Sequence, residues 1–439
     1  MKFLIVVFFV STTILLLNNC DSTEPKLEPD LKLELKDVTC TEAWLQLTTN
    51  NIQLPATINL LKNNTVTQTF SLSTQDSLLY IDSLLPNQNY SFQVSSIQNP
   101  ISSNKVTATT LDTTSHNFTW QTFTFGERTS TLYDVAIIDE NNIWAVGEIY
   151  MNDSLGNPDP SLYNLLKWNG TEWKPERIYF TNRLGQSFLA PMKSLFAFDK
   201  DDIWIGLDQL IHWDGSDYTE YELSDAIFQS WINKIWGTSS NDLYIVGNSG
   251  NIAHYGGPSV GWKKIESGTT TSLTDIYGDG ENVFICGYED FKPTVLLKYE
   301  NNSIKKIIEE TEFNYNPNYI SGWVKGIWVK RNKLFSLTFY DLYKSNVNTK
   351  GEGSALWKGD INSWGSNAVR GNDVNDIFTA GYDGLVWHYN GLGWRRYEIL
   401  ADPTNLFFKI STKENIVVFA GEKYLNGIDR YGIITFGRR

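Results

Sequence analysis

Cysteine, methionine and histidine are scarce in this chain of 439 residues. It has three cysteines, three methionines and four histidines. The cysteines, at positions 20, 40 and 286, lack the spacing of a metal site or of a disulfide framework. The sequence therefore predicts no cofactor, no metal site and no disulfide-stabilised fold.

Helical periodicity is also missing, since no long segment places apolar residues three and four positions apart. The chain is instead rich in aromatic residues, with 16 Trp and 22 Tyr, and in Asn, Thr, Ser and Gly. This composition is typical of an all-β protein with many turns. The formal net charge of −14 opposes contact with a phosphate backbone, so nucleic acid is not an expected partner.

One long apolar run is present, at residues 3–17 behind Lys2, and it is short for a membrane span but suitable for an export signal. It ends at Leu17-Asn18-Asn19-Cys20, which resembles the lipobox of bacterial lipoproteins, although Asn19 stands where a small residue is usual. The resemblance implies a signal peptide over residues 1–19, a lipidated Cys20 and a tether over 20–28. It also implies a bacterial cell-envelope protein, anchored to the outer membrane on its surface or periplasmic side. An ordinary cleaved signal or an uncleaved anchor is the alternative.

Residues 29–112 alternate apolar and polar side chains in short runs, which predicts half-buried strands. The segment Leu84-Leu85-Pro86-Asn87-Gln88-Asn89-Tyr90 resembles the tyrosine corner of fibronectin type III domains, with Gln88 in place of Thr. The resemblance implies a small immunoglobulin-like β-sandwich that acts as a spacer or in adhesion. Another Greek-key sandwich is the alternative.

Residues 117–439 contain a recurring apolar core that follows an Asx or Glu turn, as in NDLYIVG at 241–247. Seven copies end at positions 147, 207, 247, 287, 338, 381 and 421. A period near 40 residues with about four strands per repeat predicts a β-propeller. We expect seven blades, give or take one, with residues 118–125 supplying the missing outer strand of the last blade.

A second recurring piece carries an Asn-Gly or Asp-Gly hairpin between aromatic residues, as in residues 211–218. Together the two pieces resemble the repeats of Asp-box and BNR-type propellers, but Lys or His replaces the Ser/Thr of the box. A sialidase activity therefore does not follow. His212, His254 and His388 share one repeat position, on different blades, which favours a structural role over metal binding.

The inner strand of each predicted blade lines a channel, where Asp134 and Asp275 are the carboxylates. Two carboxylates that are about 5–10 Å apart could serve as the acid and the base in glycoside hydrolysis. They are weak catalytic candidates, and a solvated channel is the simpler interpretation. An exported carbohydrate-active enzyme is therefore the alternative function, and a structural envelope protein is a third.

Long connections are predicted on one rim of the ring, at residues 148–163, 180–191, 309–322 and 339–354. Exposed aromatic residues in such loops suit sugar rings or a protein partner. The predicted binding residues are Tyr150, Tyr315, Tyr319, Trp323, Tyr340 and Tyr343. We expect a monomeric, membrane-anchored binding module that recognises a glycan or a cell-envelope protein, rather than an enzyme.

Overall fold

The structure is a computed structural model in which almost all regular elements are β-strands. It describes residues 28–98, 100–181, 185–280, 282–311, 318–347, 357–359, 361, 365–425 and 427–439. The predicted signal peptide, Cys20 and Tyr315 lie outside these residues. Across the described ranges, we find no helix with the length and apolar character that a bilayer crossing requires.

The chain forms two compact units. The first contains residues up to Lys36, Trp44–Ile81 and Asn89–Ala108, and the second contains Asp37–Ala43, Asp82–Gln88 and Thr109–Arg439.

Two antiparallel sheets carry the first part of the chain. Their strand orders are β1-β2-β5 and β4-β3-β6-β7. The alternating sequence explains the core, because every second side chain of a strand such as β3 is buried. The strands are β1 (Asp30–Val38), β2 (Ala43–Asn50), β3 (Ala56–Lys62), β4 (Thr65–Leu72), β5 (Asp76–Ile81), β6 (Asn89–Ser96) and β7 (Val106–Thr109).

The described part of the second unit contains seven four-stranded antiparallel sheets and a short two-stranded sheet of β13 (Phe180–Thr181) and β14 (Ser187–Phe188). Six of them use four strands that follow one another in the chain. These are β9 (Thr131–Asp139), β10 (Asn142–Ile149), β11 (Tyr163–Trp168) and β12 (Trp173–Glu176); β15 (Ser194–Asp199), β16 (Asp202–Gly206), β17 (Leu210–Trp213) and β18 (Tyr218–Tyr221); β19 (Ile232–Ser239), β20 (Asp242–Gly247), β21 (Asn251–Tyr255) and β22 (Trp262–Glu266); β23 (Leu273–Gly278), β24 (Val283–Gly287), β25 (Thr294–Glu300) and β26 (Ser303–Glu310); β27 (Val324–Lys330), β28 (Lys333–Thr338), β29 (Leu342–Asn346) and β30 (Trp357–Lys358); β31 (Ser366–Asp373), β32 (Asp376–Gly381), β33 (Val386–Tyr389) and β34 (Trp394–Arg396).

The last sheet joins the two ends of the unit. Its strands are β35 (Asn405–Lys413), β36 (Ile416–Leu425), β37 (Asp429–Arg438) and β8 (Thr119–Phe125). β8 pairs antiparallel with β37, from Phe125 opposite Gly432 to Thr119 opposite Arg438. This is the pairing predicted for residues 118–125, and it covers an edge that would otherwise expose unpaired backbone groups.

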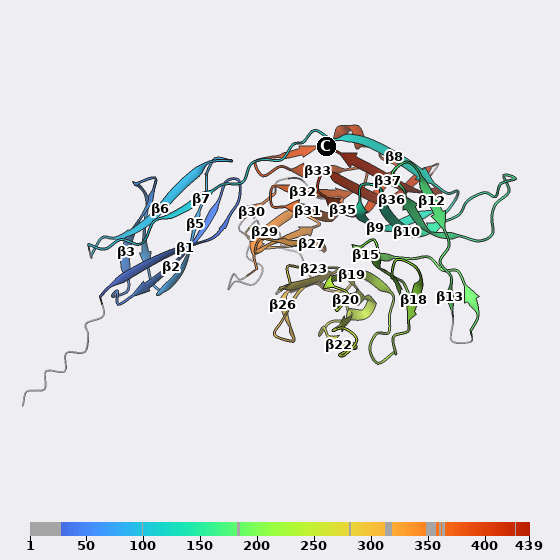
Figure 1. Ribbon diagram of the computed structural model, residues 1–439, viewed down its shortest axis with the longest axis horizontal. Coiled ribbons are helices and arrows are strands. Elements are labelled where there is room, and N and C mark those ends of the chain that lie inside the picture. Colours follow the sequence, from blue (N-terminus) through green and yellow to red (C-terminus); the bar gives the residue numbers. More distant parts are fainter. Residues whose placement is uncertain are drawn as a thin grey trace, which may run out of the picture. The chain divides into compact units, whose positions relative to one another are not determined.

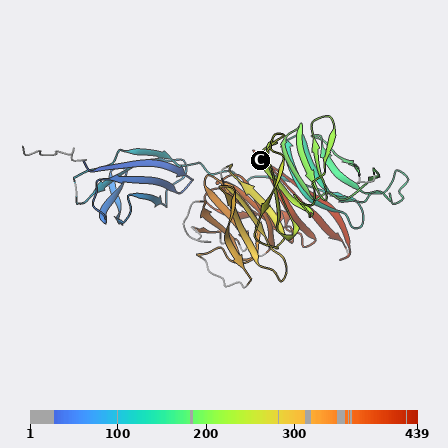
Figure 2. The same cartoon turned by 90° about the horizontal axis from the view of Figure 1, so that it is seen from below.

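The sheets are arranged around a common centre in Figure 1, and Figure 2 shows the same sheets from a direction at right angles to that view. The first strands of successive sheets contact one another from β9 to β35, and β35 contacts β9. Apolar side chains of neighbouring sheets pack together, as where Val146 and Leu165 meet Ile203 and Ile205. The hydrophobic core therefore lies between the sheets.

Close packing of the backbone explains why most copies of the repeated core end in glycine. A Cβ atom at Gly287 would lie 2.2 Å from the carbonyl oxygen of Ser272, just before the first strand of the same sheet. The same clash with a carbonyl oxygen would occur at Gly147, Gly247, Gly381 and Gly421. These glycines allow the second strand to approach the start of the first.

Candidate functional site

The strand order divides the second unit into two faces. In each sheet the strands are antiparallel and follow one another outward from the centre, so the connections alternate between two edges. We call the edge that holds the second-to-third-strand and sheet-to-sheet connections the upper face. The first-to-second and third-to-fourth connections form the lower face.

Exposed large hydrophobic side chains are concentrated on the upper face. Among the described residues of the sheets and their connections, ten lie there and two, Val260 and Leu392, lie on the lower face. Trp231 is 47% exposed, Tyr319 50% and Tyr382 51%. The other seven are Leu155, Tyr179, Phe188, Phe291, Ile399, Leu425 and Ile428.

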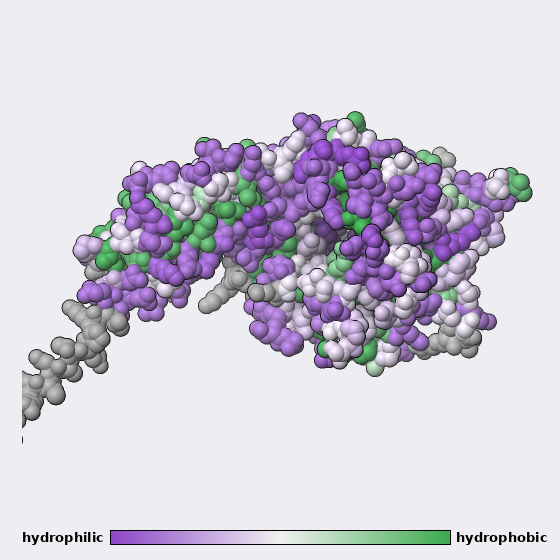
Figure 3. Space-filling view, in the orientation of Figure 1, coloured by the Kyte–Doolittle hydropathy of each residue, from purple (hydrophilic) through white to green (hydrophobic). Residues whose placement is uncertain are grey.

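The connection between β10 and β11 extends away from the sheets and ends in a hydrophobic tip (Figure 3). Leu155 in this connection is 83% exposed. Apolar groups on a soluble surface are common singly, but their accumulation on one face marks a candidate interaction surface.

Four of the predicted binding residues belong to the upper face, but they differ in exposure. Tyr319 is exposed, whereas Tyr150, Trp323 and Tyr340 are partly buried. The Tyr150 hydroxyl donates a hydrogen bond to Glu148 at 2.7 Å, and burial together with this carboxylate raises the pKa of Tyr150 to about 12. Tyr150 is therefore held in place by its own strand.

Trp323 belongs to an aromatic cluster. Its ring stacks on Tyr288 with centroids 5.8 Å apart and meets the edge of Phe339 at 5.6 Å. Phe339 in turn contacts Tyr340 at 5.5 Å. Three sheet-to-sheet or second-to-third-strand connections thus place their aromatic residues side by side.

Tyr343 was predicted to lie in a long loop, but it lies in β29 and is fully buried. The second and third strands of this sheet are joined by a short turn, closed where the Thr338 amide donates to the Asp341 carbonyl. Tyr343 consequently packs with Phe284 and Leu334 in the core and cannot contact a ligand.

The insertion of this sheet was also placed one connection too early. The chain between β29 and β30 is the long one, and it joins the third strand to the fourth. Trp357 and Lys358 form the outer strand β30, which pairs antiparallel with β29.

Two lysines on the upper face lie against aromatic rings, and the sequence pattern did not indicate them. The Lys193 Nζ is 4.3 Å from the ring centroid of Trp231 and 5.6 Å from that of Tyr133. The Lys325 Nζ is 5.7 Å from Phe339 and 5.8 Å from Tyr382. Burial lowers the pKa of both lysines. Their common position near the start of an inner strand is the one sequence signal that could have identified them.

The channel carboxylates have a different role from the one considered for them. Asp134, in β9, accepts hydrogen bonds from the Leu195 amide of β15 at 3.0 Å and from the Lys234 ammonium of β19 at 2.6 Å. Asp134 and Lys234 are both buried. One carboxylate thus connects three successive inner strands.

Asp275 repeats this arrangement three sheets later. It lies in β23 and accepts from the Ile327 amide of β27 at 3.0 Å and from both terminal nitrogens of Arg370 in β31 at 3.0 and 2.7 Å. Arg370 and Lys409 lower the pKa of Asp275 against the opposing effect of burial. The carboxylate is therefore ionised and saturated with donors.

A cavity of about 190 Å³ continues from these ion pairs toward the lower face and is lined by Lys234, Arg370, Trp236 and Tyr277 among others. Its charged side chains are the partners of Asp134 and Asp275. A glycosidase acid needs a raised pKa and an accessible proton, and Asp275 provides neither. The geometry favours a structural role for both carboxylates.

The three recurring histidines, like the channel carboxylates, make contacts between strands. His212, His254 and His388 bond through Nε2 to Asp202, Asp242 and Asp376 at 2.9, 2.7 and 2.9 Å. Each imidazole also stacks on an aromatic ring of the second strand, at 4.2 to 4.3 Å. In the part of the chain that the structure describes, no group of three or more His, Cys, Asp or Glu side chains could hold a metal ion.

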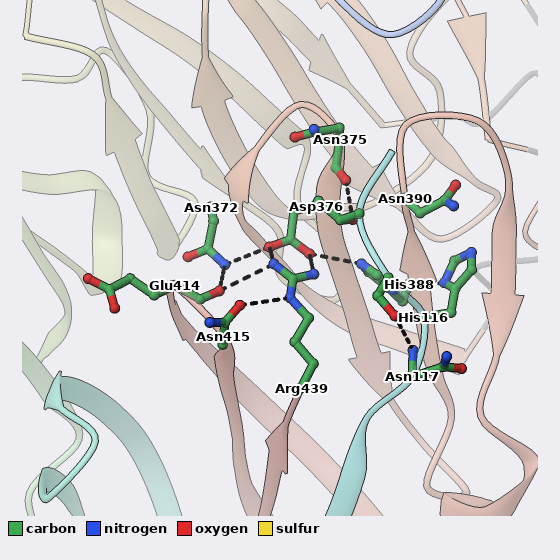
Figure 4. A network of polar contacts seen from close by, with 12 residues as sticks. His116, Asn117, Asn372, Asn375, Asp376, His388, Asn390, Glu414, Asn415 and Arg439 are labelled. Carbon is green, nitrogen blue, oxygen red and sulfur yellow. Dashed lines mark hydrogen bonds and ion pairs between the residues drawn. The ribbon is translucent and has the colours of Figure 1, made fainter. Parts of the chain in front are cut away.

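The pair in the sixth sheet is part of a larger network on the lower face (Figure 4). Asp376 accepts two hydrogen bonds from the Arg439 guanidinium, at 2.8 and 2.7 Å, and one from Asn372. His388 contacts His116 through their Nδ1 atoms at 2.8 Å. Both the segment before β8 and the C-terminal residue are thereby attached to the sixth sheet.

Solved structures share this arrangement of sheets. YCF48 bound to D1 peptide matches with a TM-score of 0.53 and 14% identity, over 73% of this chain and 95% of that one. The chain has a β-propeller fold. YCF48 from Cyanidioschyzon merolae matches with a TM-score of 0.49 and 15% identity, over 72% of this chain and 98% of that one. At these identities the likeness concerns the fold of the propeller alone.

No protein-family model matches the chain. No curated protein matches it either.

The role of Asp275 is testable by substitution. Asp275→Asn removes the partner of the buried Arg370, and we expect it to lower the free energy of unfolding by about 3–5 kcal/mol in chemical denaturation. Glu309→Gln, which breaks the exposed pair between Glu309 and Lys306, is the matched control and is expected to cost less than about 1 kcal/mol. Equal and small losses for both variants would contradict the structural role.

Proposed function

We propose that the propeller is a binding module that recognises a peptide segment of a protein partner on its upper face. The observation that carries this proposal is the unequal distribution of exposed hydrophobic side chains between the two faces. Trp and Tyr are the residues that most often dominate the energy of protein interfaces, and Trp231, Tyr319 and Tyr382 are half exposed there.

The other features of the propeller support recognition over catalysis. Its two channel carboxylates are buried in ion pairs, and its recurring histidines are bonded to carboxylates within their own sheets. YCF48, which shares the fold, has been solved with a bound peptide, so a peptide ligand is compatible with this architecture. A glycan is the second ligand class that aromatic side chains would suit.

We further propose that the seven sheets are the blades of a seven-bladed propeller, closed by β8, and that the preceding sheets form a fibronectin type III-like sandwich. The closed series of contacts between first strands supports the blade number. The two-sheet arrangement of β1 to β7, with the Leu84–Tyr90 segment before β6, supports the sandwich. The sandwich would serve as a spacer for the binding module.

The test selects random 12-residue peptides against the purified protein and measures their affinities for two double variants. Trp231→Ala with Tyr382→Ala should weaken binding by about ten-fold or more, because truncating a buried aromatic contact costs about 2 kcal/mol. Val260→Ala with Leu392→Ala removes exposed apolar groups from the lower face and should leave affinity within about two-fold.

Two results would contradict the proposal. One is a loss of affinity in the lower-face variant with none in the upper-face variant. The other is signal on a glycan array in the absence of any selected peptide, which would assign the face to carbohydrate.

We also propose that Cys20 carries the lipid that holds the protein at the bacterial cell envelope. The support is the apolar segment of residues 3–17 that ends three residues before this cysteine. In cells fed a palmitate analogue, the wild-type protein should incorporate label and fractionate with membranes, and Cys20→Ser should lose both properties. Cys40→Ser is the matched control, and label retained in the Cys20 variant would refute the anchor.

A further inference from the structure

Among the residues that the structure describes, the buried lysines are, with one exception, paired with carboxylates. Five lysines are buried in the described ranges: Lys234, Lys298, Lys325, Lys333 and Lys344. Four of them form ion pairs, with Nζ to carboxylate oxygen distances of 2.6 to 2.8 Å. Lys325 has no ion pair to any described carboxylate. Because a buried charge without a counter-charge is costly, the exception calls for a reason.

The contacts that Lys325 does make are weak. Its Nζ donates to the Ser366 carbonyl at 3.3 Å and to Asn367 Oδ1 at 3.5 Å, both longer than a typical N–H···O bond. Phe339 and Tyr382 contribute ring faces at 5.7 and 5.8 Å. An ammonium group carries three donors, so this environment leaves it short of good acceptors.

The surroundings place Lys325 within the candidate binding face. It is the second residue of β27, two positions after Trp323 of the aromatic cluster. Tyr382, one of the two rings beside its ammonium group, is 51% exposed. The ammonium group of Lys325 therefore lies beside an exposed aromatic side chain.

The electrostatic environment of Lys325 indicates which kind of ligand group would bind to its ammonium group. Burial lowers the pKa of Lys325, and no acid among the described residues opposes this effect. The formal net charge of −14 gives the protein no general attraction for acidic ligands, so selection for one must act at short range. A carboxylate in contact with the ammonium would supply the counter-charge that the other four buried lysines already have.

We propose that Lys325 binds a carboxylate of the peptide partner, either an Asp or Glu side chain or a free C-terminus. The ammonium group accepts the carboxylate in a charge-assisted hydrogen bond, and Tyr382 and the Trp323 cluster contact the flanking residues of the peptide. This inference rests on the proposed peptide-binding function and names the chemical group that the site selects.

The test uses four synthetic libraries of random ten-residue peptides. They are made with or without Asp and Glu, and with a free or an amidated C-terminus. The wild-type protein should enrich peptides only from libraries that contain a carboxylate, and the comparison between libraries distinguishes side-chain from terminal carboxylates. Calorimetry then measures the enriched peptides against Lys325→Met, Lys325→Arg and the exposed-lysine control Lys263→Met.

We expect Lys325→Met to weaken binding by about 10- to 100-fold, since a hydrogen bond between charged groups is worth roughly 1.5–3 kcal/mol. Lys325→Arg should retain most of the affinity, and Lys263→Met should match the wild type. Thermal unfolding of each variant identifies any loss that is due to misfolding.

The outcomes separate the two proposals. One outcome is that peptides are enriched equally from the library without carboxylates, and that their binding depends on Trp231 and Tyr382 but not on Lys325. This result would overturn the role of Lys325 but would leave the proposal of an upper binding face intact. Failure to enrich peptides from any library would overturn peptide recognition and, with it, the role of Lys325.

Discussion

The closed ring of inner strands is the constraint on which the rest of the second unit depends, and two buried carboxylates hold it together. Asp134 and Asp275 each bond an amide of the next inner strand and a cation of the strand after that. Each carboxylate therefore links three successive strands, and together they link six of the seven. In a buried site of low dielectric, removing one partner of such a charge pair leaves an unpaired charge, which is strongly destabilising. The ion pairs of the channel therefore have a structural role.

This use of the channel determines where recognition can take place. In the channel, Asp134 pairs with Lys234 and Asp275 pairs with Arg370. In three of the sheets a stacked Asp–His pair connects the second and third strands. What remains available is the upper face, where connections of different sheets bring aromatic residues together. Lys325 is buried like Lys234 of the channel, but it lies at the aromatic face and has no ion pair with a carboxylate of the described residues.

The sheets could be predicted from the sequence because each is a local unit. The repeated apolar core, its Asx turn and its final glycine recur at short separations, and Gly287 shows that the glycine reflects contact within one sheet. Tyr343 was misplaced because residues 339–354 were predicted to be one long connection, whereas strand β29 lies within them and the fourth strand, β30, begins at Trp357.

The site residues were harder to predict because their partners are distant in the chain. Asp275 was visible as a channel carboxylate, but Arg370 lies 95 residues away. In the same way, nothing near Lys325 in the sequence indicates that Tyr382 will contact it or that a carboxylate will be missing. The exposure of Tyr319 could be predicted because it lies in a long polar connection, which is a local signal. The contacts of Tyr288 and Phe339 with Trp323 depend on the arrangement of different sheets around the ring.

The central claim is that ligands bind the upper face. The most direct measurement is hydrogen–deuterium exchange of the wild-type protein with and without a peptide selected from a random library. Our account predicts slower exchange in segments around Trp231, Trp323 and Tyr382, with the first-to-second-strand turns unchanged. Protection confined to the lower face, around Val260 and Leu392, would contradict it.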